Sequence, residues 1–414
     1  MTTFATPTPS HPSAPNTFEA DTVQALAMVR ATFSQLVEAK CPGNPSVSDI
    51  ADTFGIHRKL AWQVGKVAYS ADPFHAAKHM PSAKSTEVWL KAAARAGCET
   101  PVVESATAAA TRFHSLAATH SRTEQEFEML LESCTRADDA AHMKWRQQSF
   151  HGNSFVWGAH CKVLLSLSVL HPSADKPHFF HIAQLRGLMG FRQTRQNVKW
   201  LVSASVVADD AAKANTGLQR MPLDPAAAGE HGGVPVIPRF CSNPMPKFSR
   251  RVVGGMTYDE FVSGPIGQTG ERTLVTGEVI RNLGAAHATE HDKVAHFGAS
   301  VRIPAEVFHY DMFVHRSLFG PVQRELVMFS DLNSNIAFAP SDTLPIPERV
   351  QDLGRGIGLA QTPDLPGYQE LAASVFQLLG ENPDEYELYR ARVAYPPMPT
   401  SVMFRHPLPE RAPE

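Results

Sequence analysis

Residues 47–66 read VSDIADTFGIHRKLAWQVGK, and their spacing predicts two short helices joined by a tight turn. Ala51 supplies the small side chain that a first helix needs where a second helix crosses closely. Gly55 accepts the positive φ that the turn between them requires. The apolar residues that would hold the two helices together are Ile50, Phe54, Ile56, Ala61 and Val64. We therefore predict helices over residues 46–54 and 57–68.

This pattern resembles the helix-turn-helix of bacterial transcription regulators, and the resemblance covers residues 47–66, with residues 17–41 as the usual preceding helix. It implies that the second helix enters the major groove of DNA with its outward side chains. Those side chains are His57, Arg58, Lys59, Trp62, Gln63 and Lys66. The alternative is a three-helix core used for protein contacts, with a cationic face that is merely solvated.

The chemistry of the second helix suits a nucleic acid. Between residues 57 and 66 there are three fixed positive charges and no acidic residue. Arginine and lysine can satisfy guanine acceptors or phosphates, glutamine can pair with adenine, and an aromatic ring can contact a thymine methyl group. An exposed tryptophan also costs solubility unless something covers it, so Trp62 favours a binding role.

Composition limits the classes of function. In 414 residues, Lys+Arg 38 against Asp+Glu 41 leaves a formal charge of -3, which excludes a globally basic coat for nucleic acid. The five cysteines form no C-x-x-C pair, so neither a zinc knuckle nor a disulfide scaffold is predicted. The most apolar stretch, residues 163–170, is too short to span a bilayer. We expect a cytoplasmic protein without a membrane segment.

The chain divides by pattern into a helical and a mixed part. Residues 1–16 are predicted to be a disordered tail, because they are rich in proline and carry no charged side chain. Residues 17–150 show helical periodicity and contain the helix-turn-helix. Residues 151–414 are predicted to be an α+β domain for sensing or assembly, which makes the overall fold class α+β. Within it we predict strands at 197–207, 273–280 and 307–315, a long loop at 208–235 and a helix at 368–379.

Several histidines have spacings that a metal site could use. His75 and His79 lie four residues apart, although no third ligand is identifiable beside them, and helix packing or a phosphate contact explains them better. In the second part, the candidate ligands for a divalent metal, or groups for acid/base chemistry, are His287, His291, His309, Asp311 and His315. The simpler interpretation is that an alternating strand places its polar side chains in water.

Two further patterns are weak. Gly264, Gly267 and Gly270 are spaced unlike a phosphate-binding loop, and a turn-rich loop explains them better. A second basic cluster, able to hold phosphate or an acidic ligand, is formed in sequence by Arg186, Arg192, Arg195 and Lys199. Neither a G-x-S-x-G nor an H-E-x-x-H motif occurs, so the common hydrolase and zinc-protease signatures are missing.

These observations predict a sequence-specific transcription regulator that binds double-stranded DNA. One recognition helix reads few base pairs, so we expect a homodimer or higher even assembly, with a small molecule or protein as effector. One alternative is a metal-dependent or acid/base enzyme in the histidine-rich second part. Another is a nucleoid or scaffold protein that binds DNA without sequence choice. No cofactor is assigned.

Overall fold

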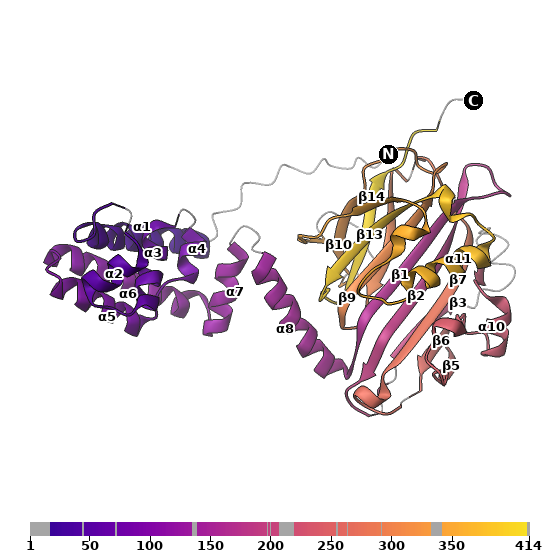
Figure 1. The fold of residues 1–414 in the computed structure, drawn as a ribbon, viewed down its shortest axis with the longest axis horizontal. Coiled ribbons are helices and arrows are strands. Elements are labelled where there is room, and N and C mark those ends of the chain that lie inside the picture. Colours follow the sequence, from indigo (N-terminus) through magenta and orange to yellow (C-terminus); the bar gives the residue numbers. More distant parts are fainter. Residues whose placement is uncertain are drawn as a thin grey trace, which may run out of the picture. The chain divides into compact units, whose positions relative to one another are not determined.

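The computed structural model describes residues 17–43, 45–70, 73–134, 139–196, 198, 200–206, 219–253, 256–262, 264–290, 292–332 and 342–411. They belong to two compact units, Met1–Ala141 and His142–Glu414, which we call unit 1 and unit 2 (Figure 1). The predicted boundary at 150/151 falls inside α8 (Asp139–Trp157), so unit 2 begins earlier than expected. Residues 1–16, the predicted tail, lie outside the described residues.

Unit 1 is helical throughout its described part. Its helices are α1 (Thr17–Glu38), α2 (Val47–Phe54), α3 (Arg58–Tyr69), α4 (Pro73–Lys78), α5 (Ala83–Arg95), α6 (Thr100–His120) and α7 (Glu124–Cys134). Local sequence signals fix several ends. Ser46 and Asp49 form a capping box at the start of α2, and the Ser82 hydroxyl accepts a hydrogen bond from the first turn of α5.

One hydrophobic core joins the helices of unit 1. Trp89 of α5 is completely buried and makes edge-to-face contacts with Phe33 of α1 and Phe54 of α2, with ring centroids 6.0 Å and 4.7 Å away. The residues predicted to hold α2 and α3 together are all buried in this core, namely Ile50, Phe54, Ile56, Ala61 and Val64. The predicted packing of the two helices is therefore confirmed.

The described part of unit 2 contains three sheets after α8. Their strands are β1 (Ala159–Pro172), β2 (Phe179–Gln193), β3 (Trp200–Val206), β4 (Gln219–Pro222), β5 (Phe248–Val253), β6 (Met256–Phe261), β7 (Arg272–Ala285), β8 (Val294–Val301), β9 (Ala305–His315), β10 (Glu325–Ser330), β11 (Thr343–Leu344), β12 (Gln351–Arg355), β13 (Tyr386–Ala394) and β14 (Thr400–Pro407). The seven-stranded sheet has the order β12-β13-β9-β1-β2-β7-β4. The smaller sheets are β11-β10-β14-β8 and β3-β6-β5.

The seven-stranded sheet is covered on both faces. On one face lie the short helical turn η4 (Ile357–Ala360) and α11 (Tyr368–Leu379), which pack on Leu165, Leu167 and Phe313 (Figure 1). On the other face the four-stranded sheet packs on Phe308, Tyr310 and Met312 of β9. β9 lies between β1 and β13 in the sheet, and one of the two covering layers packs on each of its faces. Its side chains are therefore buried on both sides.

These elements confirm the α+β class and correct one segment. Strands occur at the three predicted places, and α11 has the predicted bounds. The predicted loop at 208–235 is wrong in its described part, because β4 and a short helix, α10 (Pro225–Glu230), lie there. Among the described residues, none of the helices combines the length and the apolarity needed to cross a bilayer.

Candidate nucleic-acid interface and the buried network under α11

The turn between α2 and α3 follows from two residues. Gly55 adopts φ 65° and ψ 39°, a left-handed conformation that ends α2. His57 is the N-cap of α3, and its Nδ1 accepts a hydrogen bond of 3.2 Å from the backbone N–H of Lys59. The direction in which α3 leaves α2 is therefore set within residues 55–57.

Replacing Gly55 tests this turn. A Cβ at Gly55 would meet no heavy atom within 4 Å, so the cost of a side chain comes from the backbone conformation alone. We expect Gly55→Val to lower the free energy of unfolding of unit 1 by about 1–3 kcal/mol, measured by urea denaturation. Gly55→Asn is the matched control, because asparagine tolerates the left-handed region. Equal losses for both variants would contradict this explanation.

The six predicted DNA-binding residues lie on the surface of unit 1, but one is half-buried and another forms a hydrogen bond with α2. His57, Arg58, Lys59, Trp62 and Lys66 are exposed, whereas Gln63 is half-buried. Gln63 lines a shallow cavity of about 400 Å³ together with Ser82 and Ser85 at the start of α5. The Nη2 of Arg58 donates a hydrogen bond of 2.8 Å to the Ser48 hydroxyl of α2. Arg58 is thus held along α2, a contact that the helical periodicity of α3 alone did not indicate.

Trp62 is 39% exposed, because a neighbouring histidine covers part of its ring. The ring of His79 lies edge-on to Trp62 at 4.9 Å, and His75 lies edge-on to His79 at 4.8 Å. Burial lowers the pKa of His79, and the charges of His75, Lys66 and Lys78 lower it further. The histidine pair therefore packs against α3, and the lowered pKa favours the neutral form of His79.

The second candidate site centres on β9, where the structure overturns the expectation of a solvated polar face. His309 and Asp311 are completely buried, because residues 357–376 cover this face of the strand. Arg390 of β13 donates two hydrogen bonds of 2.8 Å to the Asp311 carboxylate, one from Nε and one from Nη2. His309 Nε2 lies 3.2 Å from Asp311 Oδ1, and its ring meets Tyr368 of α11 edge-on.

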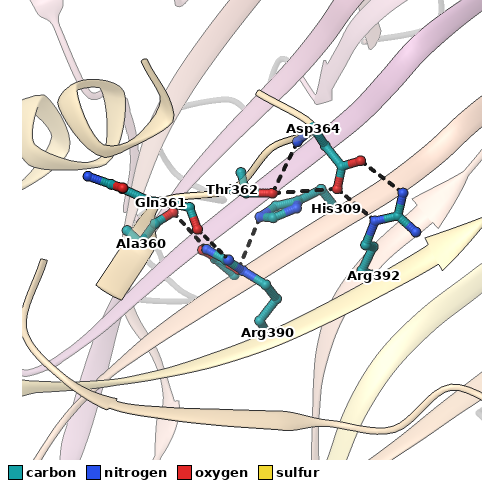
Figure 2. A network of polar contacts seen from close by, with 8 residues as sticks. His309, Ala360, Gln361, Thr362, Asp364, Arg390 and Arg392 are labelled. Carbon is teal, nitrogen blue, oxygen red and sulfur yellow. Dashed lines mark hydrogen bonds and ion pairs between the residues drawn. The ribbon is translucent and has the colours of Figure 1, made fainter. Parts of the chain in front are cut away.

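The same arginine ties β13 to the segment before α11. Arg390 also donates to the carbonyls of Ala360 and Gln361, at 2.8 Å and 2.9 Å. Beside it, Arg392 pairs with Asp364 through two hydrogen bonds of 2.7 Å and 2.8 Å. Figure 2 shows Arg390 directed at Ala360 and Gln361 and Arg392 directed at Asp364, with His309 between them. We call the buried group His309, Asp311, Arg390 and Tyr368 the β9 network.

The electrostatics of the β9 network indicate that Asp311 and Arg390 form a buried ion pair with a structural role. Burial by itself would raise the pKa of Asp311, but the hydrogen bonds from Arg390 and the contact with His309 outweigh it, so the pKa is lowered. Asp311 therefore stays ionised beside a guanidinium. With no part of His309 or Asp311 exposed, a substrate has no access to them. The network fixes the 357–368 segment onto the sheet.

The predicted metal ligands do not converge. Asp311 is occupied by Arg390, and the ring of His315 meets Tyr386 edge-on while its Nδ1 lies 2.7 Å from the Ser317 hydroxyl. His287 packs on His178, and His291 lies outside the described residues. In the parts of the chain that are described, no group of three or more His, Cys, Asp or Glu side chains is placed to hold a metal.

The predicted basic cluster of the second part is dispersed. Arg192 pairs with Glu271, Arg195 donates to the carbonyl of Val156, and Lys199 lies outside the described residues. Arg186 instead projects from β2 into a cavity of unit 2. Arg195 lies beyond the end of β2, and the register of β2 with β7 shifts between Leu188 and Phe191, which lie between Arg186 and Arg192. The glycines at 264, 267 and 270 lie in a loop with one short helical turn, as expected.

Comparisons with known proteins add no family. No protein-family model matches the chain, and no match was found among curated proteins or solved structures.

Proposed function

We propose that unit 1 binds double-stranded DNA through α3 and that the protein is a sequence-specific transcription regulator. One observation carries this proposal: Arg58, Lys59 and Lys66 are exposed on one helix, with no acidic residue between 57 and 66. The helix is anchored to α2 through a fully buried apolar seam and a turn of fixed conformation. A rigid cationic helix of this kind can present side chains to base edges while lysines contact phosphates.

The contacts of α3 suggest different roles for its side chains. Arg58 starts the helix and is steadied by Ser48, which suits a bidentate contact to a guanine. Lys59 and Lys66 lie about two helical turns apart on the exposed surface of α3 and suit phosphates on either side of the groove. Trp62 lies between them in sequence, and the ring of His79 meets its ring edge-on. A homodimer would place two such helices about 34 Å apart on DNA.

The test begins with selection of bound sequences from random duplex DNA by the full chain, followed by fluorescence anisotropy with the recovered site. We expect Arg58→Ala to weaken binding by about 1–3 kcal/mol if it contacts a base. Lys59→Ala and Lys66→Ala should each reduce the slope of log affinity against log salt by about 0.9.

The matched control is Lys91→Ala, which removes an exposed lysine of α5 that pairs with Glu87. It should leave both the affinity and the slope unchanged. Wild-type binding by all three α3 variants would refute the proposal. If the α3 variants lost binding but the selection recovered no preferred sequence, the nucleoid or scaffold alternative would be favoured. A recovered site with two half-sites related by two-fold symmetry would establish the dimer.

A further inference from the structure

Unit 2 encloses a cavity of about 610 Å³ on the face of the seven-stranded sheet opposite α11. Its floor is formed by β1, β2 and β7, and its walls come from β3 and the end of β8. The volume is within the range of small-molecule sites, which is about 300–1,000 Å³. One edge is open to water, because the Arg302 side chain that lines it is 70% exposed.

The floor of the cavity contains an apolar row. Phe308, Leu164, Leu188 and Leu274 are successive partners across β9, β1, β2 and β7, so their side chains share one face of the sheet. All four line the cavity, and the ring of Trp200 adds an aromatic wall. This half of the cavity suits an apolar body.

The next row of the floor consists of polar side chains that form no hydrogen bond or ion pair within the described residues. Ser166, Arg186 and Thr276 are successive partners across β1, β2 and β7, and all three line the cavity. Ser166 and Thr276 are 4% and 8% exposed. Within the described parts of the chain, neither hydroxyl has a hydrogen-bond partner, and the Arg186 guanidinium forms no hydrogen bond or ion pair.

The charges around Arg186 leave this guanidinium available. The side chain is exposed to the cavity yet enclosed by its walls, and this enclosure lowers its pKa. Glu278 is the nearby carboxylate on β7, and it lies 3.8 Å from Arg220. Glu278 favours the charged form of Arg186 and the charges of Arg220 and Arg302 oppose it, while the guanidinium forms no ion pair within the described residues, so an anion entering the cavity would be stabilised.

We propose that this cavity binds a small amphipathic acid, with its single carboxylate at Arg186, Ser166 and Thr276 and its apolar body along the leucine row. The Arg186 guanidinium matches one negative charge, because Arg302, the other arginine of the lining, lies 3.9 Å from Asp331. The two hydroxyl donors can complete the hydrogen bonds of the second carboxylate oxygen. The apolar row argues against a free inorganic anion, which would leave that half of the cavity unfilled. This ligand would bind unit 2 whether or not unit 1 binds DNA.

The experiment uses the full chain without DNA, so that its outcome is separate from that of the DNA proposal. Octanoate and 1-naphthaleneacetate are titrated by calorimetry, each beside its neutral counterpart, 1-octanol or 1-naphthaleneethanol. We expect both acids to bind, and Arg186→Gln to weaken the acids about tenfold or more while leaving the alcohols unchanged. Arg186→Lys should restore part of the affinity, because the charge is kept but not the fork of donors.

Two further variants locate the site. Arg281, on β7, is also half-exposed but does not line the cavity. The Arg281→Gln variant should therefore bind the acids as the wild-type chain does. Leu188→Trp fills the apolar half and should weaken the acids and the alcohols together. The proposal would be overturned if neither acid bound the wild-type chain, or if Arg186→Gln bound the acids with unchanged affinity.

Discussion

Replacement of Arg390 by methionine is expected to lower the free energy of unfolding of unit 2 by about 3–5 kcal/mol, measured by urea denaturation at pH 7. The reason is that Asp311 is completely buried and receives two of its hydrogen bonds from this side chain. Without Arg390, an ionised carboxylate would remain in the core, and the carbonyls of Ala360 and Gln361 would lose their donor.

The neighbouring arginine supplies a matched control. Arg392 makes the same kind of paired hydrogen bond with Asp364, but its side chain is 44% exposed, so water can replace the lost contact. Arg392→Met should therefore cost no more than about 1 kcal/mol. The double variant Asp311→Leu with Arg390→Met should recover most of the stability lost in Arg390→Met, because no unpaired charge remains. Equal losses for the two arginine variants would contradict the role assigned to burial.

The same pair predicts a pH dependence. The folded-state pKa of Asp311 is lowered, so the pair contributes stability above the unfolded-state pKa, about 3.9, and that stability is lost as pH falls through the folded-state pKa. Asp311→Asn removes the charge at every pH. The stability difference between wild type and Asp311→Asn should therefore be largest near neutral pH and shrink below about pH 4. A difference that stays constant to pH 2 would mean that Asp311 is not ionised in the fold.

Local signals explain why α2, α3 and α11 could be predicted closely from the sequence. Each boundary depends on residues within a few positions, such as Ser46 at the start of α2 or the left-handed Gly55 at its end. The exposed cationic surface of α3 followed from helical periodicity, because the apolar positions of residues 50–64 already identify the buried side. The contact between Arg58 and Ser48 depends on the crossing of two helices, which periodicity does not describe.

The β9 network could not be predicted in the same way. Strand alternation correctly separates His309 and Asp311 from Phe308 and Tyr310, but alternation does not decide whether the polar face meets water. The cover comes from α11 and η4, and the counter-charge Arg390 lies far along the chain. A weak signal was present, since α11 is amphipathic and its apolar side requires a sheet face to pack on.

The cavity of unit 2 could not be predicted from the sequence either. Arg186 looked like one member of a basic cluster because arginines follow at 192 and 195. Its real neighbours are Ser166 and Thr276, which lie beside it only when β1, β2 and β7 pair in register. Registers between strands that are distant in sequence depend on the whole sheet, so single-sequence patterns do not reveal a site of this kind.

Replacement of Trp89 by alanine is expected to lower the free energy of unfolding of unit 1 by about 3–5 kcal/mol, because it empties the centre of the core of that unit. Trp89 is completely buried and contacts Phe33 and Phe54, so it links α5 to both α1 and α2. Its indole N–H has no hydrogen-bond partner among the described residues, so the loss comes from packing. Trp89→Phe keeps an aromatic ring in the core and should cost less than Trp89→Ala.

Trp62, in the same unit, is partly exposed where Trp89 is buried. It is 39% exposed on α3, so Trp62→Ala should change stability by no more than about 1 kcal/mol while weakening binding to the selected DNA. Among the described residues, unit 1 and unit 2 have separate hydrophobic cores, since no residue of the Trp89 core belongs to the sheets. Calorimetry should therefore show Trp89→Ala shifting one transition and Arg390→Met shifting another. If either variant shifted both transitions equally, the two units would unfold as one cooperative body, and a ligand in the cavity of unit 2 would then stabilise α2 and α3 as well.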